Sequence, residues 1–195
     1  MAPVAVLIGF HGQADASTVL YQNGTFASPP NAHSIGVGRV VSDSFSLGQT
    51  VEISGFTFSM TSDYANPDVS WAISTGHSAG GTVIASGSGN VSGQYVGNTY
   101  WGAKFYLVEI DFQPVQVESG SYWLSLYGVP LIIGVGYPGW AWAAGTPTSS
   151  AYVDGSSNDD SHYFQIRGSQ VPEPSPWLIA GGMLLAGCFP RRRPQ

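Results

Sequence analysis

Apolar side chains recur at every second position through the middle of the chain. The segments 69–73, 106–112 and 122–126 each place alternate apolar residues on one face, which is the pattern of half-buried β-strands. Gly55 interrupts a fourth segment where the alternation changes phase, and this predicts a β-bulge. No part of residues 17–168 keeps a 3.6-residue period. The sequence therefore predicts an all-β body, folded as an antiparallel β-sandwich or a jelly-roll-like domain.

Few charged residues accompany these strands. Only 9% of the residues are charged whereas 43% are hydrophobic, a balance that excludes a disordered chain and disfavours a helical bundle rich in Glu and Lys. Clusters of Gly, Asn, Asp and Ser, such as 86–90 and 155–160, are predicted turns between strands. The basic residues of the body are Arg39, Lys104 and Arg167. These are too few to neutralise a phosphate backbone, so we expect no nucleic-acid binding.

The first 16 residues have the character of a secretory signal peptide. Residues 2–10 are almost wholly apolar, and residues 14–16 have the Ala-x-Ala pattern of a cleavage site. No Lys or Arg precedes Arg39, so the basic start typical of such peptides is missing. We therefore expect the native protein to begin upstream of Met1. The alternative is an apolar segment that forms a first strand.

Residues 169–195 combine a proline-rich motif, an uncharged apolar run and a cluster of arginines, in that order. The motif is Val171, Pro172, Glu173 and Pro174, the run includes Trp177, Leu178, Ile179, Met183, Leu184, Leu185 and Phe189, and the cluster is Arg191, Arg192 and Arg193. As a helix the run spans about 20 Å, which a thinned bilayer and an interfacial Trp177 could match to the ~30 Å hydrocarbon core. We expect one C-terminal transmembrane helix, with the arginines in the cytoplasm and the body outside it. The alternative is a buried core helix with a basic tail.

This tail resembles the PEP-CTERM sorting signal of exopolysaccharide-producing Gram-negative bacteria. The resemblance rests on the order of the three features, while Pro176 and Pro190 depart from the usual pattern. It implies an exosortase, a membrane-embedded processing enzyme, as the partner of this chain. It also implies an exported precursor anchored in the inner membrane and then delivered to the cell surface or extracellular matrix, in connection with exopolysaccharide and biofilm.

The body is similar to the choice-of-anchor domains, in particular the R type. The similarity lies in six short segments, 41–45, 55–58, 68–73, 81–86, 120–124 and 163–166, which read VSDSF, GFTF, DVSWAI, GTVIAS, GSYWL and YFQI. Such domains are extracellular and bacterial, and they occur attached to alternative C-terminal anchors. The resemblance implies a surface domain and no particular biochemical activity.

The body offers few candidates for catalysis. His33, His77 and His162 lack the spacing of metal ligands and are expected to be ordinary loop or strand-end residues. Glu109 and Asp111 share a strand face and could act as the acid and base of a glycoside hydrolase, although such a face is usually solvated. We expect a protein that is not an enzyme and has no cofactor.

The acidic segment near the end of the body is a weak calcium candidate. Asp154, Asn158, Asp159 and Asp160 gather oxygen ligands of the kind that calcium prefers. Their spacing is not that of an EF-hand, and a polar turn is the alternative. We expect no other metal site.

Tryptophans provide the remaining candidates. Trp71 lies in an alternating strand and is predicted to be a core residue. Trp140 and Trp142 would share one face of an extended segment, where exposed rings could stack on sugars; burial of the rings is the alternative. The sequence thus favours a non-enzymatic exported surface or matrix protein. A carbohydrate-binding module on the same anchor is the second hypothesis, and a hydrolase is a distant third.

Overall fold

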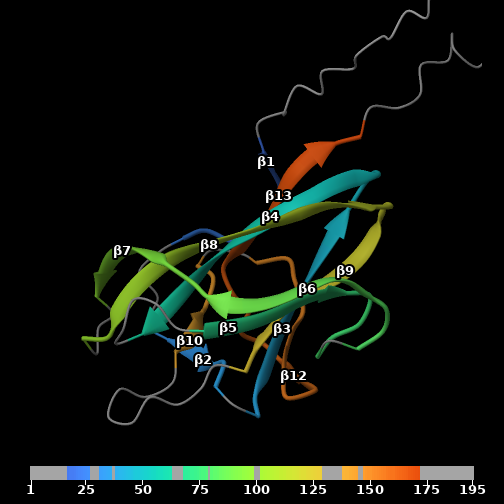
Figure 1. Cartoon of the computed structure of the whole chain (residues 1–195). Coiled ribbons are helices and arrows are strands. Elements are labelled where there is room, and N and C mark those ends of the chain that lie inside the picture. The colour runs from blue at the N-terminus through green and yellow to red at the C-terminus, as the bar shows by residue number, and fades with distance from the viewer. Residues whose placement is uncertain are drawn as a thin grey trace, which may run out of the picture.

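The computed structural model describes residues 17–26, 31–36, 38–62, 68–78, 80–98, 102–128, 138–144 and 147–171. Over these ranges the chain forms thirteen β-strands and no helix, arranged in two sheets packed on each other (Figure 1). Every strand pairing in both sheets is antiparallel. The prediction of an all-β, antiparallel, sandwich-like body is confirmed for this part of the chain.

The larger sheet is organised around the long strand β4. This strand pairs with β8 along one edge and with β13 and then β10 along the other. β7 lies beyond β8, while β1 and β2 lie at the opposite side of the sheet, next to β13 and β10. The strands of this sheet are β1 (Thr18–Asn23), β2 (Ala32–Ser34), β4 (Val51–Ser62), β7 (Gly93–Asn98), β8 (Lys104–Val117), β10 (Gly139–Ala141) and β13 (Phe164–Gln170). Since β13 continues to Gln170, the sheet extends past the predicted boundary at residue 168.

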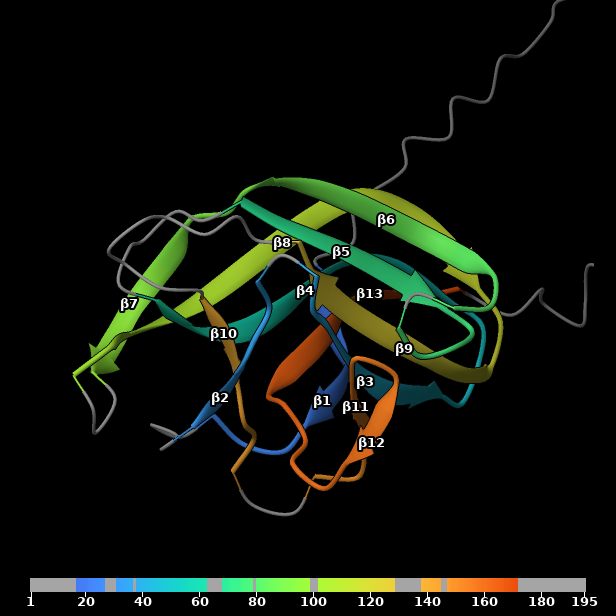
Figure 2. The same cartoon turned by 90° about the horizontal axis from the view of Figure 1, so that it is seen from below.

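The smaller sheet has the order β12-β11-β3-β9-β5-β6. Its strands are β3 (Val40–Leu47), β5 (Asp68–Ser74), β6 (Val83–Asn90), β9 (Gly120–Tyr127), β11 (Ala151–Val153) and β12 (Ser156–Asn158). β6 and β12 are therefore its two edges. Figure 2 shows them on opposite sides of the molecule, with β6 near β8 and β12 on the side of β1 and β2.

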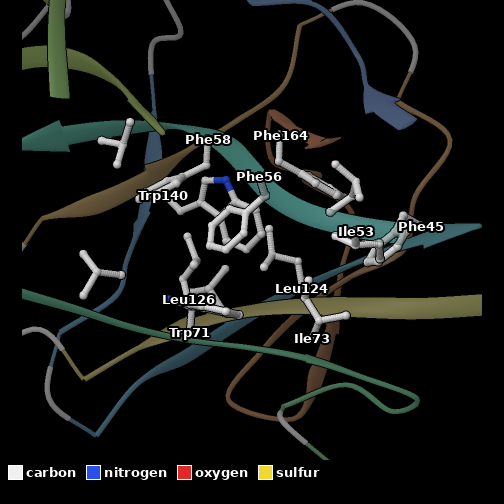
Figure 3. Close-up of a cluster of buried hydrophobic side chains, with 14 of the residues drawn as sticks. Phe45, Ile53, Phe56, Phe58, Trp71, Ile73, Leu124, Leu126, Trp140 and Phe164 are labelled. Carbon is white, nitrogen blue, oxygen red and sulfur yellow. The ribbon is translucent and has the colours of Figure 1, made fainter. Parts of the chain in front are cut away.

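Large apolar side chains fill the space between the sheets (Figure 3). Phe56 and Phe58 of β4 point toward Leu124 and Leu126 of β9, and all four are fully buried. Burying a side chain of this size contributes about 1.5–3 kcal/mol, so this layer is the main source of stability. Trp71 belongs to the same cluster, as the sequence predicts.

The bulge predicted at Gly55 is present. The pairing of β4 with β8 changes register between Ile53 and Gly55. A Cβ atom at Gly55 would lie 2.6 Å from the carbonyl oxygen of Ile110 and 2.8 Å from Oδ1 of Asp111. Only glycine therefore fits the point where the two strands come back into register.

The predicted turn at residues 86–90 is wrong, because these residues form most of strand β6. They pair continuously with β5, from Ala72 opposite Ser86 to Asp68 opposite Asn90. Glycine and serine weaken a strand in isolation, but pairing with a neighbouring strand and packing against Trp71 outweigh that preference here. The second predicted turn, 155–160, likewise contains strand β12. The turn itself is formed by Asp154 and Gly155, whose φ angles of 52° and 81° are typical of a type I′ hairpin.

Both ends of the chain lie outside the described residues. These ends include the signal-like residues 1–16 and the segment 172–195, which holds most of the sorting motif, the apolar run and the arginines. In the described ranges there is no helix with the length and apolar character needed to cross a membrane.

Candidate functional site

A groove of about 470 Å³ opens between the two sheets, where β6 faces the middle of β8. Its volume falls within the range of about 300–1,000 Å³ typical of ligand pockets. Residues 86–92 and 109–112 line it together with Val69 and Trp71. The rings of Trp71 and Phe112 lie 4.7 Å apart. The groove is thus a gap in the sandwich with apolar residues, the small and polar residues of β6, and two carboxylates in its lining.

Two glycines in β6 explain why the gap exists. Gly87 and Gly89 pair with Trp71 and Val69 of β5 and therefore face the interior with them. A Cβ atom at Gly87 would lie 2.9 Å from the Trp71 ring, whereas a Cβ atom at Gly89 would meet nothing within 4 Å. Gly87 is thus required for the packing of Trp71, while Gly89 leaves an inward position of the sandwich unfilled.

The segment that forms this side of the molecule carries no formal charge. No Asp, Glu, Lys or Arg lies between Asp68 and Lys104, a segment that includes most of β5 and all of β6 and β7. Three of the large hydrophobic side chains exposed in the described residues belong to it, namely Val83, Tyr95 and Val96. This uncharged segment is the sequence signal that could have pointed to the groove.

The carboxylates predicted as a possible catalytic pair, Glu109 and Asp111, are exposed residues of β8 that help to line the groove. Asp111 Oδ1 lies 2.7 Å from Nη2 of Arg167, and Glu109 Oε2 lies 3.7 Å from Nη1 of the same residue. The two side chains do share a strand face, as expected. Both are exposed and both face one guanidinium, which is the arrangement of a surface ion-pair cluster.

A second polar cluster lies on the opposite side of the sandwich. Asp43 and His162 are fully buried. Asp43 Oδ2 accepts a 2.6 Å hydrogen bond from the backbone N–H of His162 and lies 3.2 Å from its Nδ1. His162 Nε2 lies 2.8 Å from Nδ1 of half-buried His33. His33 in turn contacts Asn158, with 3.0 Å between Nε2 and Nδ2, and Trp142, with 3.2 Å between Nδ1 and Nε1.

The donors and acceptors of this Asp43–His162–His33 network determine where its protons lie. A carboxylate only accepts hydrogen bonds, so His162 Nδ1 carries a proton and donates it to Asp43. The indole N–H of Trp142 only donates, so Nδ1 of His33 accepts from it. The network thus has a fixed acceptor at Asp43 and a fixed donor at Trp142.

Burial sets the charge state of the outer histidine. The pKa of His33 is lowered from its usual 6.5, first by burial and then by the nearby His162, while Asp160 acts in the opposite direction and Arg39 adds to the lowering. A neutral His33 with its proton on Nε2 leaves Nδ1 able to accept from Trp142. Chemically, an Asp–His–His chain can pass a proton between the interior and the surface. Structurally, it ties β2 and β3, which belong to different sheets.

The sequence interpretation of these histidines as ordinary residues missed this network. Asp43, His33 and His162 lie in separate parts of the chain, and no motif joins them. One signal was available: Asp43 alternates with Val41, Phe45 and Leu47 on the inward face of β3. A carboxylate on a core face needs a buried partner, although the sequence does not say which one.

The exposed pair of tryptophans considered as a sugar contact is not formed, and the alternative of burial holds for Trp140. Trp140 is 0% exposed, its Nε1 donates to the carbonyl oxygen of Tyr163 at 3.0 Å, and its ring packs on His162 and Phe164. Trp142 is half-buried, with its N–H directed at His33. Because β10 is part of the larger sheet, Trp140 points into the core and cannot stack on a sugar from solution.

The acidic calcium candidate is engaged with other protein groups. Asp154 Oδ1 accepts from the backbone N–H of Val40 at 2.9 Å, and its Oδ2 lies 3.2 Å from Nε of Arg39. Asn158 Oδ1 accepts from the N–H of Asp160. Among the residues that the structure describes, no group of three His, Cys, Asp or Glu side chains is placed to hold a metal ion.

Comparisons with known proteins found no family model, no curated protein and no solved structure that matches this chain. Function is therefore inferred from the sequence and geometry of the chain itself. Of the sorting motif, only Val171 lies within the described residues.

Proposed function

We propose that this chain is an exported, non-enzymatic protein of the cell surface or extracellular matrix, sorted through residues 169–195. The observation that carries the proposal is the order of three features in that segment: the Val-Pro-Glu-Pro motif, the uncharged run from Trp177 to Phe189, and the arginines 191–193. An exosortase would process this tail, and a connection with exopolysaccharide follows from the same resemblance.

The physical chemistry of the tail supports this role. Pro172 and Pro174 lack amide donors and favour an extended backbone around Glu173. A single transmembrane helix from Trp177 to Phe189 would hold this extended segment at the membrane surface. The arginines would keep the far end in the cytoplasm. A glutamate-marked, extended peptide beside the bilayer is accessible to a membrane-embedded processing enzyme.

The described body is compatible with a non-enzymatic role. Glu109 and Asp111 both face Arg167 on an open sheet face, whereas glycoside hydrolysis needs two carboxyl groups that flank a bound sugar. The body also has little positive charge, which suits a protein that functions away from nucleic acids.

The test compares Glu173→Ala with wild type in a host that possesses an exosortase, by size on gels and by cell fractionation. We expect Glu173→Ala to enter the membrane normally but to remain unprocessed, because the change removes a recognition group and leaves the apolar run intact. Glu118→Ala is the matched control, since Glu118 is an exposed carboxylate far along the chain from the motif. The proposal fails if Glu173→Ala is processed and localised like wild type.

A second variant separates membrane insertion from recognition. Leu184→Arg places a charge near the centre of the apolar run, which costs about 2.5–3.5 kcal/mol on insertion scales. We expect it to reduce the membrane-bound fraction of the precursor, unlike Glu173→Ala. Equal membrane insertion of Leu184→Arg and wild type would contradict the assignment of this run as the membrane segment.

A further inference from the structure

We propose that the groove between β6 and β8 binds an extended peptide strand from a partner protein. The partner strand would pair with the outer edge of β6 and place alternate apolar side chains in the groove. This inference goes beyond the sorting proposal and depends only on the geometry of the body. The ligand class is a peptide with bulky apolar side chains at every second position and without acidic residues.

β6 is the edge strand best suited to such pairing. It forms the outer edge of the smaller sheet and pairs only with β5 in the described part of the chain. From Ala85 to Asn90 its register is regular, and it contains no charged residue and no proline. Edge strands normally carry such features because an unprotected row of N–H and C=O groups invites another strand.

The other edges near the groove and around the sheets are interrupted. β1 and β7 each contain a register shift, and β2 and β12 are only three residues long. The register shift of β6 lies near its start, between Val83 and Ala85, and leaves the six residues from Ala85 to Asn90 regular. β7 pairs with β8 only as far as Val108, so β8 has a free edge opposite β6. That edge is broken at Pro114, inside a stretch where the pairing with β4 also skips. β6 therefore offers the more regular backbone.

The groove offers space for the side chains of a peptide strand that pairs with β6. In strand addition, main-chain hydrogen bonds give affinity and pockets for alternate side chains give specificity. Inward side chains of a strand paired with β6 would point toward Trp71, Ile110 and Phe112, since alternate side chains leave a sheet on the same face. The empty space at Gly89 gives them room.

The same geometry argues against two other occupants. A second copy paired through its own β6 would present Ala85, Gly87 and Gly89 to the groove, and these are too small to fill it. An anionic polymer would meet no basic side chain among the lining residues, which include the exposed carboxylates of Glu109 and Asp111. Charge and volume thus favour an uncharged inward face with large side chains.

The experiment uses the purified full chain and a labelled peptide in which four Thr-Leu repeats are flanked by lysines, with binding followed by fluorescence anisotropy. Gly89→Leu should weaken peptide binding by at least about tenfold, because its side chain extends into the groove from a Cβ position that meets nothing within 4 Å. Gly48→Leu is the matched control: its Cβ also meets nothing within 4 Å, and Gly48 does not line the groove. This control should bind within about twofold of wild type. Thermal unfolding of both variants checks that the fold is retained.

A second peptide tests the backbone pairing directly. Methylation of alternate amide nitrogens removes the hydrogen bonds of one peptide edge, so the methylated peptide should lose binding to wild type. No binding of the parent peptide, equal binding of the methylated peptide, or full binding by Gly89→Leu would each overturn the proposal. It would also be overturned by competition from neutral dextran, or by a concentration-dependent dimer of wild type that Gly89→Leu abolishes. None of these results bears on processing of the tail, so the peptide-binding proposal and the sorting proposal can fail independently.

Discussion

The side of the sandwich near β2 and β12 is filled with side chains, whereas the side near β6 and β8 is hollow. On the filled side, Trp140 and His162 are fully buried, their rings pack together, and Asp43 Oδ2 accepts a hydrogen bond from the backbone N–H of His162. On the hollow side, Gly87 and Gly89 provide no side chains for the corresponding space. Polar and aromatic side chains thus close the side near β2 and β12, whereas the side near β6 and β8 stays open because two inward positions of β6 are glycines.

An inward-facing strand position can hold either a buried side chain or a glycine, and the two choices have different consequences. A buried carboxylate and histidine stabilise the fold only while each has its partner, because an unpartnered buried polar group costs about 1–3 kcal/mol. A glycine at an inward position forgoes apolar burial but creates space for a ligand. The filled side should therefore be sensitive to loss of side chains, and the hollow side should be sensitive to their addition.

The largest expected effect comes from Asp43→Ala on the filled side. The change leaves the N–H and Nδ1–H of buried His162 without an acceptor, and we expect a loss of about 3–5 kcal/mol in the free energy of unfolding. Denaturant unfolding followed by tryptophan fluorescence measures it. Asp43→Asn keeps one acceptor oxygen and should lose clearly less. Equal stability of Asp43→Ala and wild type would show that the network does not support the fold.

Gly87→Ala should have the next largest effect, on the hollow side. The added methyl group would lie 2.9 Å from the Trp71 ring, so either the ring or β6 must move. Overpacking of this kind costs about 1–3 kcal/mol. The measurement is again denaturant unfolding, together with the fluorescence of the native state. An unchanged unfolding free energy would mean that Trp71 is not held against β6.

The sequence predicts the strands of the two sheets better than it predicts the side-chain network on one side of the sandwich and the groove on the other. Period-two alternation predicts β4, β5, β8 and β9, the bulge at Gly55 and the burial of Trp71, because these follow from residues close together in the chain. The second half of β6 is missed because its Gly and Ser residues are typical of turns. Its strand conformation depends on pairing with β5, which is a tertiary interaction.

The side chains that fill or line each side of the sandwich are brought together from distant parts of the sequence. Asp43 and His162 meet across 119 positions of sequence, and nothing in either local segment identifies the other. Trp140 and Trp142 alternate as an exposed pair would, yet β10 joins the larger sheet and turns Trp140 inward. Alternation predicts that two residues share a face but not which face is buried.

Gly89→Ala should produce a small effect of the opposite sign to Gly87→Ala. The methyl group at residue 89 meets no atom within 4 Å, and the backbone there does not require glycine. Reduced freedom of the unfolded chain should stabilise the fold by about 0.4–1 kcal/mol. The two variants differ by two positions in one strand, so each is the control for the other. Destabilisation by Gly89→Ala as large as that by Gly87→Ala would show that the groove is not open at this point.

The smallest expected effect is a dependence of stability on pH through His33. Its pKa in the folded protein is lowered from 6.5 by burial and by His162, so the unfolded chain binds a proton more readily than the folded one. The stabilisation from neutral His33 is therefore fully present above about pH 6.5 and is lost as the pH falls through the folded pKa. Unfolding free energies measured between pH 7.5 and 5 should fall with decreasing pH. They should fall less steeply in His33→Gln, which retains a neutral hydrogen-bonding group facing Asn158. An identical pH dependence in the two proteins would show that His33 does not carry this sensitivity.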